Sequence, residues 1–292
     1  MKECIQRVIR KNNKESLLNS IKKQARWNQK DAYPSCKEWE KEDNKFFEFA
    51  GQEGQLKLYA NRLTTDNTSR RGETINELRA AYFLKKGCGA SIVQWHPSKG
   101  QGEFTISIVG SNIFCEVKSP GWEGEVVRDQ GSNSPCLKKP KYIHAETKGI
   151  DNSPLIICTV NKAYKKFSNN TPNLLIIIDD FWMDCFTEGL CIDRALYRPK
   201  LQPPYVDSKP EGLFVGRNYE KLGGVLFLKF ELIIGRGFVW KVHISLNNNA
   251  MPNVRIPQKL VDIIESIRKI DNSAVEIYKI DNGWLSAKRF LI

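Results

Sequence analysis

The chain has 292 residues, which is enough to bury a full hydrophobic core in one large domain or in two small ones. Its 45 Lys and Arg residues against 33 Asp and Glu residues give a formal net charge of +12, so its surface should attract polyanions. No apolar run approaches the roughly 20 residues of a membrane span and no signal-peptide core follows Met1, so we expect no membrane partner and a cytoplasmic location.

Residues 1–65 are predicted to form a basic helical N-terminal segment. Its first part, residues 1–30, holds nine Lys or Arg residues against Glu3 and Glu15, a run that is equally typical of a solvated helix face. Residues 66–69 read as a linker or turn. A helix is then expected from about Thr74 to Lys86, ended by Gly87 and Gly89, with a short strand from Ala90 to Trp95.

Residues 103–118 alternate between apolar and polar side chains, which predicts a β-hairpin. Gly110-Ser111 fits the turn, because glycine supplies the positive φ that a type II′ turn needs at its first position. Glu103 would then face Lys118. A shift of the pairing by two residues keeps Glu103, Glu116 and Lys118 on the same face of the hairpin.

Two carboxylates and an ammonium on one face suit metal-assisted cleavage of a phosphodiester bond. Cross-strand neighbours lie about 5 Å apart, a span that Mg²⁺ ions can bridge through oxygen ligands at roughly 2.1 Å. The alternative is a solvated sheet face with a surface ion pair. The Glu-x-Lys triplet alone is weak evidence, because Glu146 and Lys148 form a second one in a polar stretch without a strand pattern.

The rest of the chain predicts further elements of both kinds. Residues 119–153 read as a loop, residues 155–167 as a helix and residues 173–178 as a fully buried strand. Residues 224–230, 231–234 and 238–246 suggest an antiparallel β region with a turn at 235–237, and Pro257 opens an amphipathic helix. We therefore divide the chain into the segment 1–65, a core at 66–185, and a β-rich C-terminal region at 186–292 that ends in a helix and would pack on the core.

A third carboxylate is expected from the helix before the hairpin. Glu77, Ala81 and Leu84 share one ridge of that helix, where the small alanine lets the helix approach a sheet closely. Alternatively, Thr74 and Glu77 form a capping box, and Glu77 serves only the helix start. In that case Glu73 is the substitute.

These segments together resemble the PD-(D/E)XK nuclease superfamily, the restriction-endonuclease-like fold. The resemblance covers about Thr74 to Asp179 and rests on the helix with Glu77, on Glu103 before a strand, and on Glu116-Val-Lys118. The family order of helix, three-stranded meander, helix and strand matches the order predicted here. The resemblance implies an α/β fold with a mixed central sheet flanked by helices, extended by the helical N-terminal segment and the β-rich C-terminal region.

The resemblance also implies catalytic roles for the matching residues. Glu103 and Glu116 would bind Mg²⁺, for which Mn²⁺ would substitute, Glu77 would be an auxiliary ligand, and Lys118 would position the attacking water. The family more often has Asp where this chain has Glu103. Some members carry Gln in the second helix, where this chain offers Lys165 and Lys166, which better suit phosphate contacts.

Further basic and aromatic residues are candidates for nucleic-acid contacts. Lysines in a loop are also commonly just solvated, and a lone Trp is commonly packed. The candidate residues are Arg70, Arg71, Trp122, Lys138, Lys139, Lys141, Lys165 and Lys166.

The sequence therefore predicts a Mg²⁺-dependent endodeoxyribonuclease of restriction type acting on double-stranded DNA. A homodimer is left open. The alternatives are a catalytically inactive nucleic-acid-binding module on the same fold and an RNA-cleaving relative.

The cysteines and histidines form no metal-binding pattern. The chain has eight cysteines without a Cys-x-x-Cys pair and three scattered histidines, which argues against a structural zinc site. Cys88, Cys115 and Cys158 lie in or beside apolar segments and are expected to be reduced core thiols.

Overall fold

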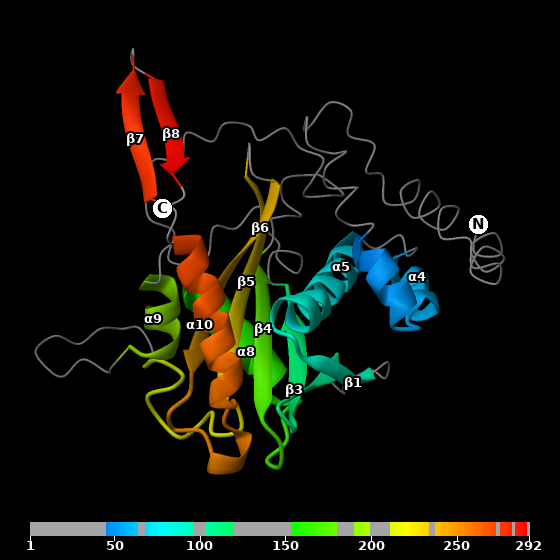
Figure 1. Cartoon of the computed structure of the whole chain (residues 1–292). Helices are drawn as coiled ribbons and strands as arrows, with labels where there is room; N and C mark the ends of the chain where they lie inside the picture. Colours follow the sequence, from blue (N-terminus) through cyan, green and yellow to red (C-terminus); the bar gives the residue numbers. More distant parts are fainter. Residues whose placement is uncertain are drawn as a thin grey trace, which may run out of the picture.

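A six-stranded mixed β-sheet forms the centre of the protein, with its strands in the order β1-β2-β3-β4-β5-β6 (Figure 1). β1 to β3 form an antiparallel meander, β4 lies parallel to β3, β5 lies parallel to β4, and β6 returns antiparallel to β5. The strands are β1 (Ser91–Trp95), β2 (Phe104–Ile108), β3 (Ser111–Lys118), β4 (Asn173–Asp179), β5 (Gly224–Ile233) and β6 (Gly237–Leu246).

The computed structural model describes nine segments of the chain. They are residues 45–63, 68–95, 103–119, 153–179, 190–198, 211–233, 237–272, 275–281 and 284–290. The basic run at 1–30 and the predicted loop from 120 onward, with Trp122, Lys138, Lys139 and Lys141, lie outside them.

Helices cover both faces of the sheet (Figure 1). α5 (Thr68–Tyr82) and α10 (Gln258–Asn272) pack on one face, and α8 (Ser153–Tyr164) and α9 (Leu190–Leu196) pack on the other. β4 is therefore apolar throughout its buried length, Leu174 to Ile178, because it faces a helical layer on each side. This arrangement confirms the predicted mixed α/β class.

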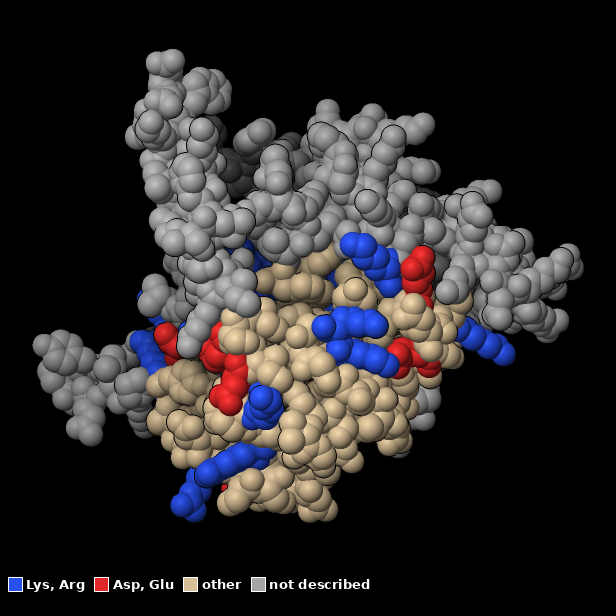
Figure 2. Space-filling model, viewed as in Figure 1, with Lys and Arg blue, Asp and Glu red and all other residues tan. Residues whose placement is uncertain are grey.

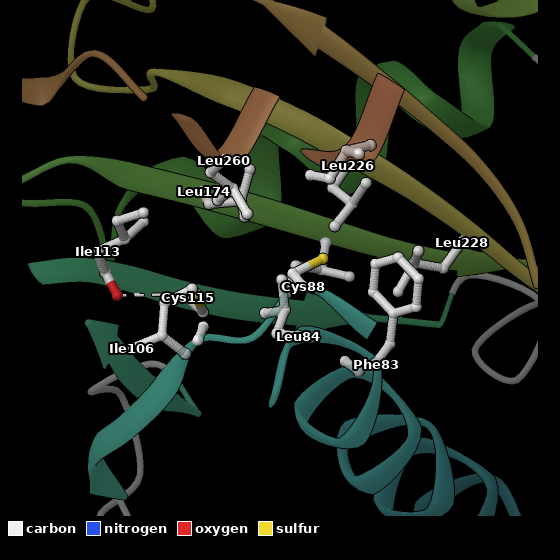
Figure 3. Packing of buried hydrophobic residues seen from close by; sticks show 14 of the residues in the cluster. Phe83, Leu84, Cys88, Ile106, Ile113, Cys115, Leu174, Leu226, Leu228 and Leu260 are labelled. Atoms are coloured by element: carbon white, nitrogen blue, oxygen red, sulfur yellow. Dashed lines mark hydrogen bonds between the residues drawn. The ribbon is translucent and has the colours of Figure 1, made fainter. Parts of the chain in front are cut away.

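The larger core cluster lies between the sheet and the layer of α5 and α10. Figure 3 shows Phe83 and Leu84, from the short π-helix Phe83–Gly87 that follows α5, in the same buried cluster as side chains of β2 to β5 and Leu260 of α10. Burying each such side chain contributes roughly 1.5–3 kcal/mol. This cluster fixes α5, and with it Glu77, against the end of the hairpin.

An aromatic cluster attaches two further helices to α5. Residues 45–52 are helical, and α4 (Leu56–Leu63) follows them. Phe46 packs edge-on against Tyr82 and Phe230, and Tyr59 of α4 packs edge-on against Trp95. This packing holds α4 beside the predicted site.

The structure differs from the sequence predictions in four respects. α5 begins at Thr68, so the predicted linker was wrong at Thr68 and Ser69, and Thr74 is a buried helix-interior residue, not a cap. Cys88 and Cys115 are buried as expected, but Cys158 is exposed, because it lies on the outer side of α8. A hairpin of β7 (Val275–Asp281) and β8 (Trp284–Phe290) follows α10 and was not predicted.

The fourth difference is the turn of the β2–β3 hairpin. Ile108 pairs with Ser111, so the turn residues are Val109 and Gly110 instead of Gly110 and Ser111. Both have positive φ, 49° and 77°, as a type I′ turn requires. The pairing has shifted by two residues, and the polar face of the hairpin is therefore the predicted one.

Candidate functional site

Glu103 and Glu116 lie close together at one end of the β2–β3 hairpin. Glu103 immediately precedes β2, and its backbone N–H donates a hydrogen bond of 3.1 Å to the Cys115 carbonyl oxygen. Side chains alternate along β3, so Cys115 points into the core under α5 and Glu116 points to the face that carries α8. Burial and then the charge of Glu116 raise the pKa of Glu103, as expected for neighbouring carboxylates.

Glu116 is a fully buried carboxylate held by two lysines. Its side chain is 0% exposed, and Lys166, just beyond the end of α8, donates to Oε1 over 2.6 Å. Lys118 Nζ lies 3.3 Å from the same oxygen. Among the described residues Oε2 has no hydrogen-bond partner. A buried anionic oxygen of this kind is costly unless another positive or donating group reaches it.

Glu77 contributes a third carboxylate, from α5. Its side chain is 5% exposed, and both of its oxygens accept hydrogen bonds from the guanidinium of Arg62 on α4. Burial and then the negative charge of Glu103 raise the pKa of Glu77 to about 8, although Arg62 acts in the opposite direction. The three glutamates thus form a series in which each carboxylate repels the next.

The surroundings of Glu77 explain why Arg62 occupies this position. Tyr59 lies one turn before Arg62 on α4, and the guanidinium stacks over its ring at 5.6 Å. Burial and then Glu77 raise the pKa of the Tyr59 phenol, which therefore stays neutral. Tyr59 and Arg62 were not predicted as site residues, because the packing of α4 against α5 is a tertiary contact that has no local sequence signal.

The donor set fits a hard divalent cation. Carboxylate oxygens are the ligands that Mg²⁺ and Mn²⁺ prefer, and the unpartnered Oε2 of Glu116 is one such oxygen. In the part of the chain that the structure describes, no three His, Cys, Asp or Glu side chains are already arranged to hold a metal ion. Arg62 and Lys166 instead donate hydrogen bonds to Glu77 and Glu116, so a cation would compete with them.

The predicted residues divide into three groups. The structure brings together Glu77, Glu103, Glu116 and Lys118, and it adds Lys166, whose contact with Glu116 was not predicted. Lys165 points elsewhere and lines a hollow between α8 and α9. Arg70 and Arg71 lie in the first turn of α5, but their side chains, like those of Trp122, Lys138, Lys139 and Lys141, lie outside the described residues.

None of the described helices is both long enough and apolar enough to cross a lipid bilayer. Comparison of the chain with protein-family models, with curated proteins and with solved structures finds no match. Function is therefore inferred from the chemistry of the site itself.

Proposed function

We propose that this protein is a metal-dependent nuclease that hydrolyses DNA phosphodiester bonds, an endodeoxyribonuclease of restriction type. The observation that carries the proposal is Glu116, a fully buried carboxylate between Lys118 and Lys166 with one oxygen unpartnered among the described residues. Combined with Glu103 and Glu77, it offers oxygen ligands beside ammonium groups, the combination that phosphoryl chemistry uses.

The fold supports the same proposal. The order of α5, β1, β2, β3, α8 and β4 is the order of helix, three-stranded meander, helix and strand that the resemblance to the PD-(D/E)XK superfamily implies. Glu116 and Lys118 lie at the carboxyl end of β3, which is parallel to β4. Ligands of open α/β sheets bind outside the carboxyl ends of parallel strands.

The residues divide the chemistry among themselves in this proposal. Glu103 and Glu116 would hold the cation and Glu77 would assist them. The cation, when bound, lowers the pKa of a water and offsets negative charge at phosphorus. Lys118 and Lys166 already lie on Glu116, so their ammonium groups would face a phosphate that approaches this carboxylate and stabilise the charge that develops on its oxygens.

A catalytically inactive DNA-binding module is the second candidate. Two observations favour it. Both oxygens of Glu77 already accept hydrogen bonds from Arg62, and among the described residues no three potential metal ligands are arranged around one point. The presence of Glu103 at a position where the superfamily more often has Asp also favours an inactive module. An RNA-cleaving enzyme would differ only in its substrate.

Cleavage assays separate these candidates. Supercoiled plasmid, linear duplex, single-stranded DNA and structured RNA would each be incubated with Mg²⁺, Mn²⁺ or EDTA. We expect metal-dependent cutting of duplex DNA, reduced at least about 100-fold in Glu116→Gln and Lys118→Ala. Glu211→Gln, at an exposed position, is the matched control and should cut like the wild type. Tight DNA binding without cutting, unchanged in Glu116→Gln, would establish the inactive module instead.

A second prediction concerns Lys166 as a competitor of the cation. Lys166→Met should lower the free energy of unfolding of the metal-free protein by about 2 kcal/mol, because Glu116 then loses the shorter of the two lysine contacts that it makes within the described residues. Urea denaturation with and without Mg²⁺ should show a larger stabilisation by Mg²⁺ in Lys166→Met than in the wild type. Equal stabilisation of both proteins would mean that Mg²⁺ does not bind at Glu116.

A further inference from the structure

A hollow of about 670 Å³ lies between α8 and α9, on the face of the sheet opposite α5 and α10. Four basic side chains line it: Lys162 of α8, Lys165 of the turn after α8, Arg194 of α9, and Arg198 just after the end of α9. Pro154 and Ile157 provide apolar parts of its wall. None of the described residues that line it is acidic.

The two helices bring these cations together because they pack on each other through their apolar sides. Ile156 and Val160 of α8 belong to the same buried cluster as Ile192 and Ala195 of α9. The basic side chains lie on the outer sides of the same helices, so their positions are fixed by the packing beneath them. Positive charge is thereby concentrated in a concave surface, where its field attracts a polyanion most strongly.

The opposite face differs. Figure 2, which shows the face covered by α5 and α10, has its Lys and Arg side chains scattered and mixed with Asp and Glu. Among the described residues that line the hollow, by contrast, the charged side chains are all basic.

The hollow is joined to the candidate site through two consecutive residues. Lys165 lines the hollow, while Lys166 donates to Glu116 over 2.6 Å. The hollow and the candidate site therefore both lie beside the turn that follows α8.

We infer that the α8–α9 hollow binds the phosphate backbone of substrate DNA beside the cleaved bond. This inference rests on the proposed function for the identity of the ligand. Lys162, Lys165, Arg194 and Arg198 supply the contacts to phosphate, which position the DNA without specifying its base sequence.

The salt dependence of binding tests the inference. A labelled duplex would be titrated in EDTA with protein carrying Glu116→Gln, so that neither metal nor cleavage enters the measurement. Lys162→Ala/Lys165→Ala and Arg194→Ala/Arg198→Ala should each make the slope of log K against log salt shallower by between about 1 and 2, since one phosphate contact contributes about 0.9. Lys86→Ala/Lys259→Ala removes the same charge from exposed positions on α10 and the π-helix after α5, and should leave the slope near that of the parent.

The outcomes separate the inference from the proposed function. If the wild type cuts DNA but the two double variants of the hollow have the same salt slope as the control variant, the inference is overturned and the proposed nuclease activity stands. If the wild type never cuts DNA but both double variants of the hollow have shallower salt slopes, the proposed nuclease activity is overturned. The contact between the hollow and the phosphate backbone then belongs to a DNA-binding module.

Cys158 provides a second measurement that needs no pocket substitution. This exposed thiol also lines the hollow, whereas Cys88 and Cys115 are buried. Bound duplex should slow the alkylation of Cys158, followed by peptide mass spectrometry, while Cys88 and Cys115 stay unreacted as an internal reference. An alkylation rate of Cys158 that is the same with and without DNA would contradict the inference.

Discussion

At the scale of single residues, the site is defined by carboxylates whose burial opposes their charge. Glu77 and Glu103 both have raised pKa values, caused first by burial and then by a neighbouring carboxylate. The sequence predicted these residues because strand alternation and helix spacing are local signals. It did not predict Arg62 or the contact of Lys166 with Glu116, because these contacts join residues 15 and 50 positions apart.

The raised pKa of Glu77 predicts how stability depends on pH. The folded protein keeps a proton on Glu77 up to about pH 8, whereas the unfolded chain releases it near the ordinary value of 4.5. Unfolding therefore releases a proton over this range, and the stability of the metal-free protein should fall as pH rises from 7 to 8. Burial lowers the pKa of His243, which therefore does not titrate in this interval.

Thermal denaturation at pH 7 and pH 8, in EDTA, measures this effect. We expect the midpoint of the wild type to be lower at pH 8 than at pH 7, and the difference to be smaller in Glu77→Gln. This comparison within each protein does not depend on how much overall stability Glu77→Gln loses through its weaker contact with Arg62. Exposed Glu211→Gln should follow the wild type. A wild-type midpoint that stays constant or rises would show that Arg62 keeps Glu77 ionised throughout.

At the scale of elements, the β2–β3 hairpin contains a turn with an unfavourable residue. Val109 has φ 49° and is 78% exposed, so its side chain gains little packing in return for the left-handed conformation. This conformation costs a β-branched residue about 1–2 kcal/mol, and Asn followed by Gly is the preferred type I′ pair. Val109→Asn should therefore raise the free energy of unfolding by about 1 kcal/mol in urea denaturation.

Gly110→Ala, at the other turn residue, should have the opposite effect on stability. A Cβ at Gly110 meets nothing within 4 Å, so only its φ of 77° opposes the change, and we expect a loss of about 1 kcal/mol. Both variants should bind metal like the wild type, since the turn lies at the far end of the hairpin from Glu103 and Glu116. A Val109→Asn protein that is less stable than the wild type would contradict the turn assignment.

The same hairpin shows what sequence patterns determine. Alternation fixed which side chains share a face, because a register change of two residues leaves the faces unchanged. It did not fix the turn, since Val109 is a residue that turn preferences reject. β4 was equally predictable from its apolar run, whereas the joining of β5 to β4 was not, because parallel pairing depends on strands about 50 residues apart.

At the scale of the whole molecule, hydrogen bonds at the amino ends of β4 and β5 join the two halves of the sheet without using the residues of the candidate site. Glu116 and Lys118 lie toward the carboxyl end of β3. At the amino ends, Gly223 donates to the Asn173 carbonyl oxygen over 3.0 Å and accepts from the Asn247 backbone N–H over 3.0 Å. The buried Asn173 side chain donates to the Lys221 carbonyl oxygen over 2.7 Å. These bonds join the start of β5 to β4, and the residue that follows β6 to the residue that precedes β5.

Gly223 is required there by space. A Cβ on Gly223 would lie 2.2 Å from the Val254 carbonyl oxygen and 3.2 Å from that of Asn173, both of them backbone atoms. Gly223→Ala should therefore lower the free energy of unfolding by about 3 kcal/mol, measured by urea denaturation. Gly216→Ala, where a Cβ meets nothing within 4 Å, should change it by less than about 0.5 kcal/mol.

Gly223→Ala also allows stability and Mg²⁺ affinity to be tested separately. Under conditions where this variant remains folded, its affinity for Mg²⁺ should equal that of the wild type, because the atoms that Gly223 contacts belong to Asn173, Asn247 and Val254 and not to the three glutamates of the candidate site. Isothermal titration at low temperature measures this affinity. A Gly223→Ala protein that is stable but binds Mg²⁺ weakly would mean that β5 and β6 shape the site through β4, and that the sheet transmits strain along its parallel strands.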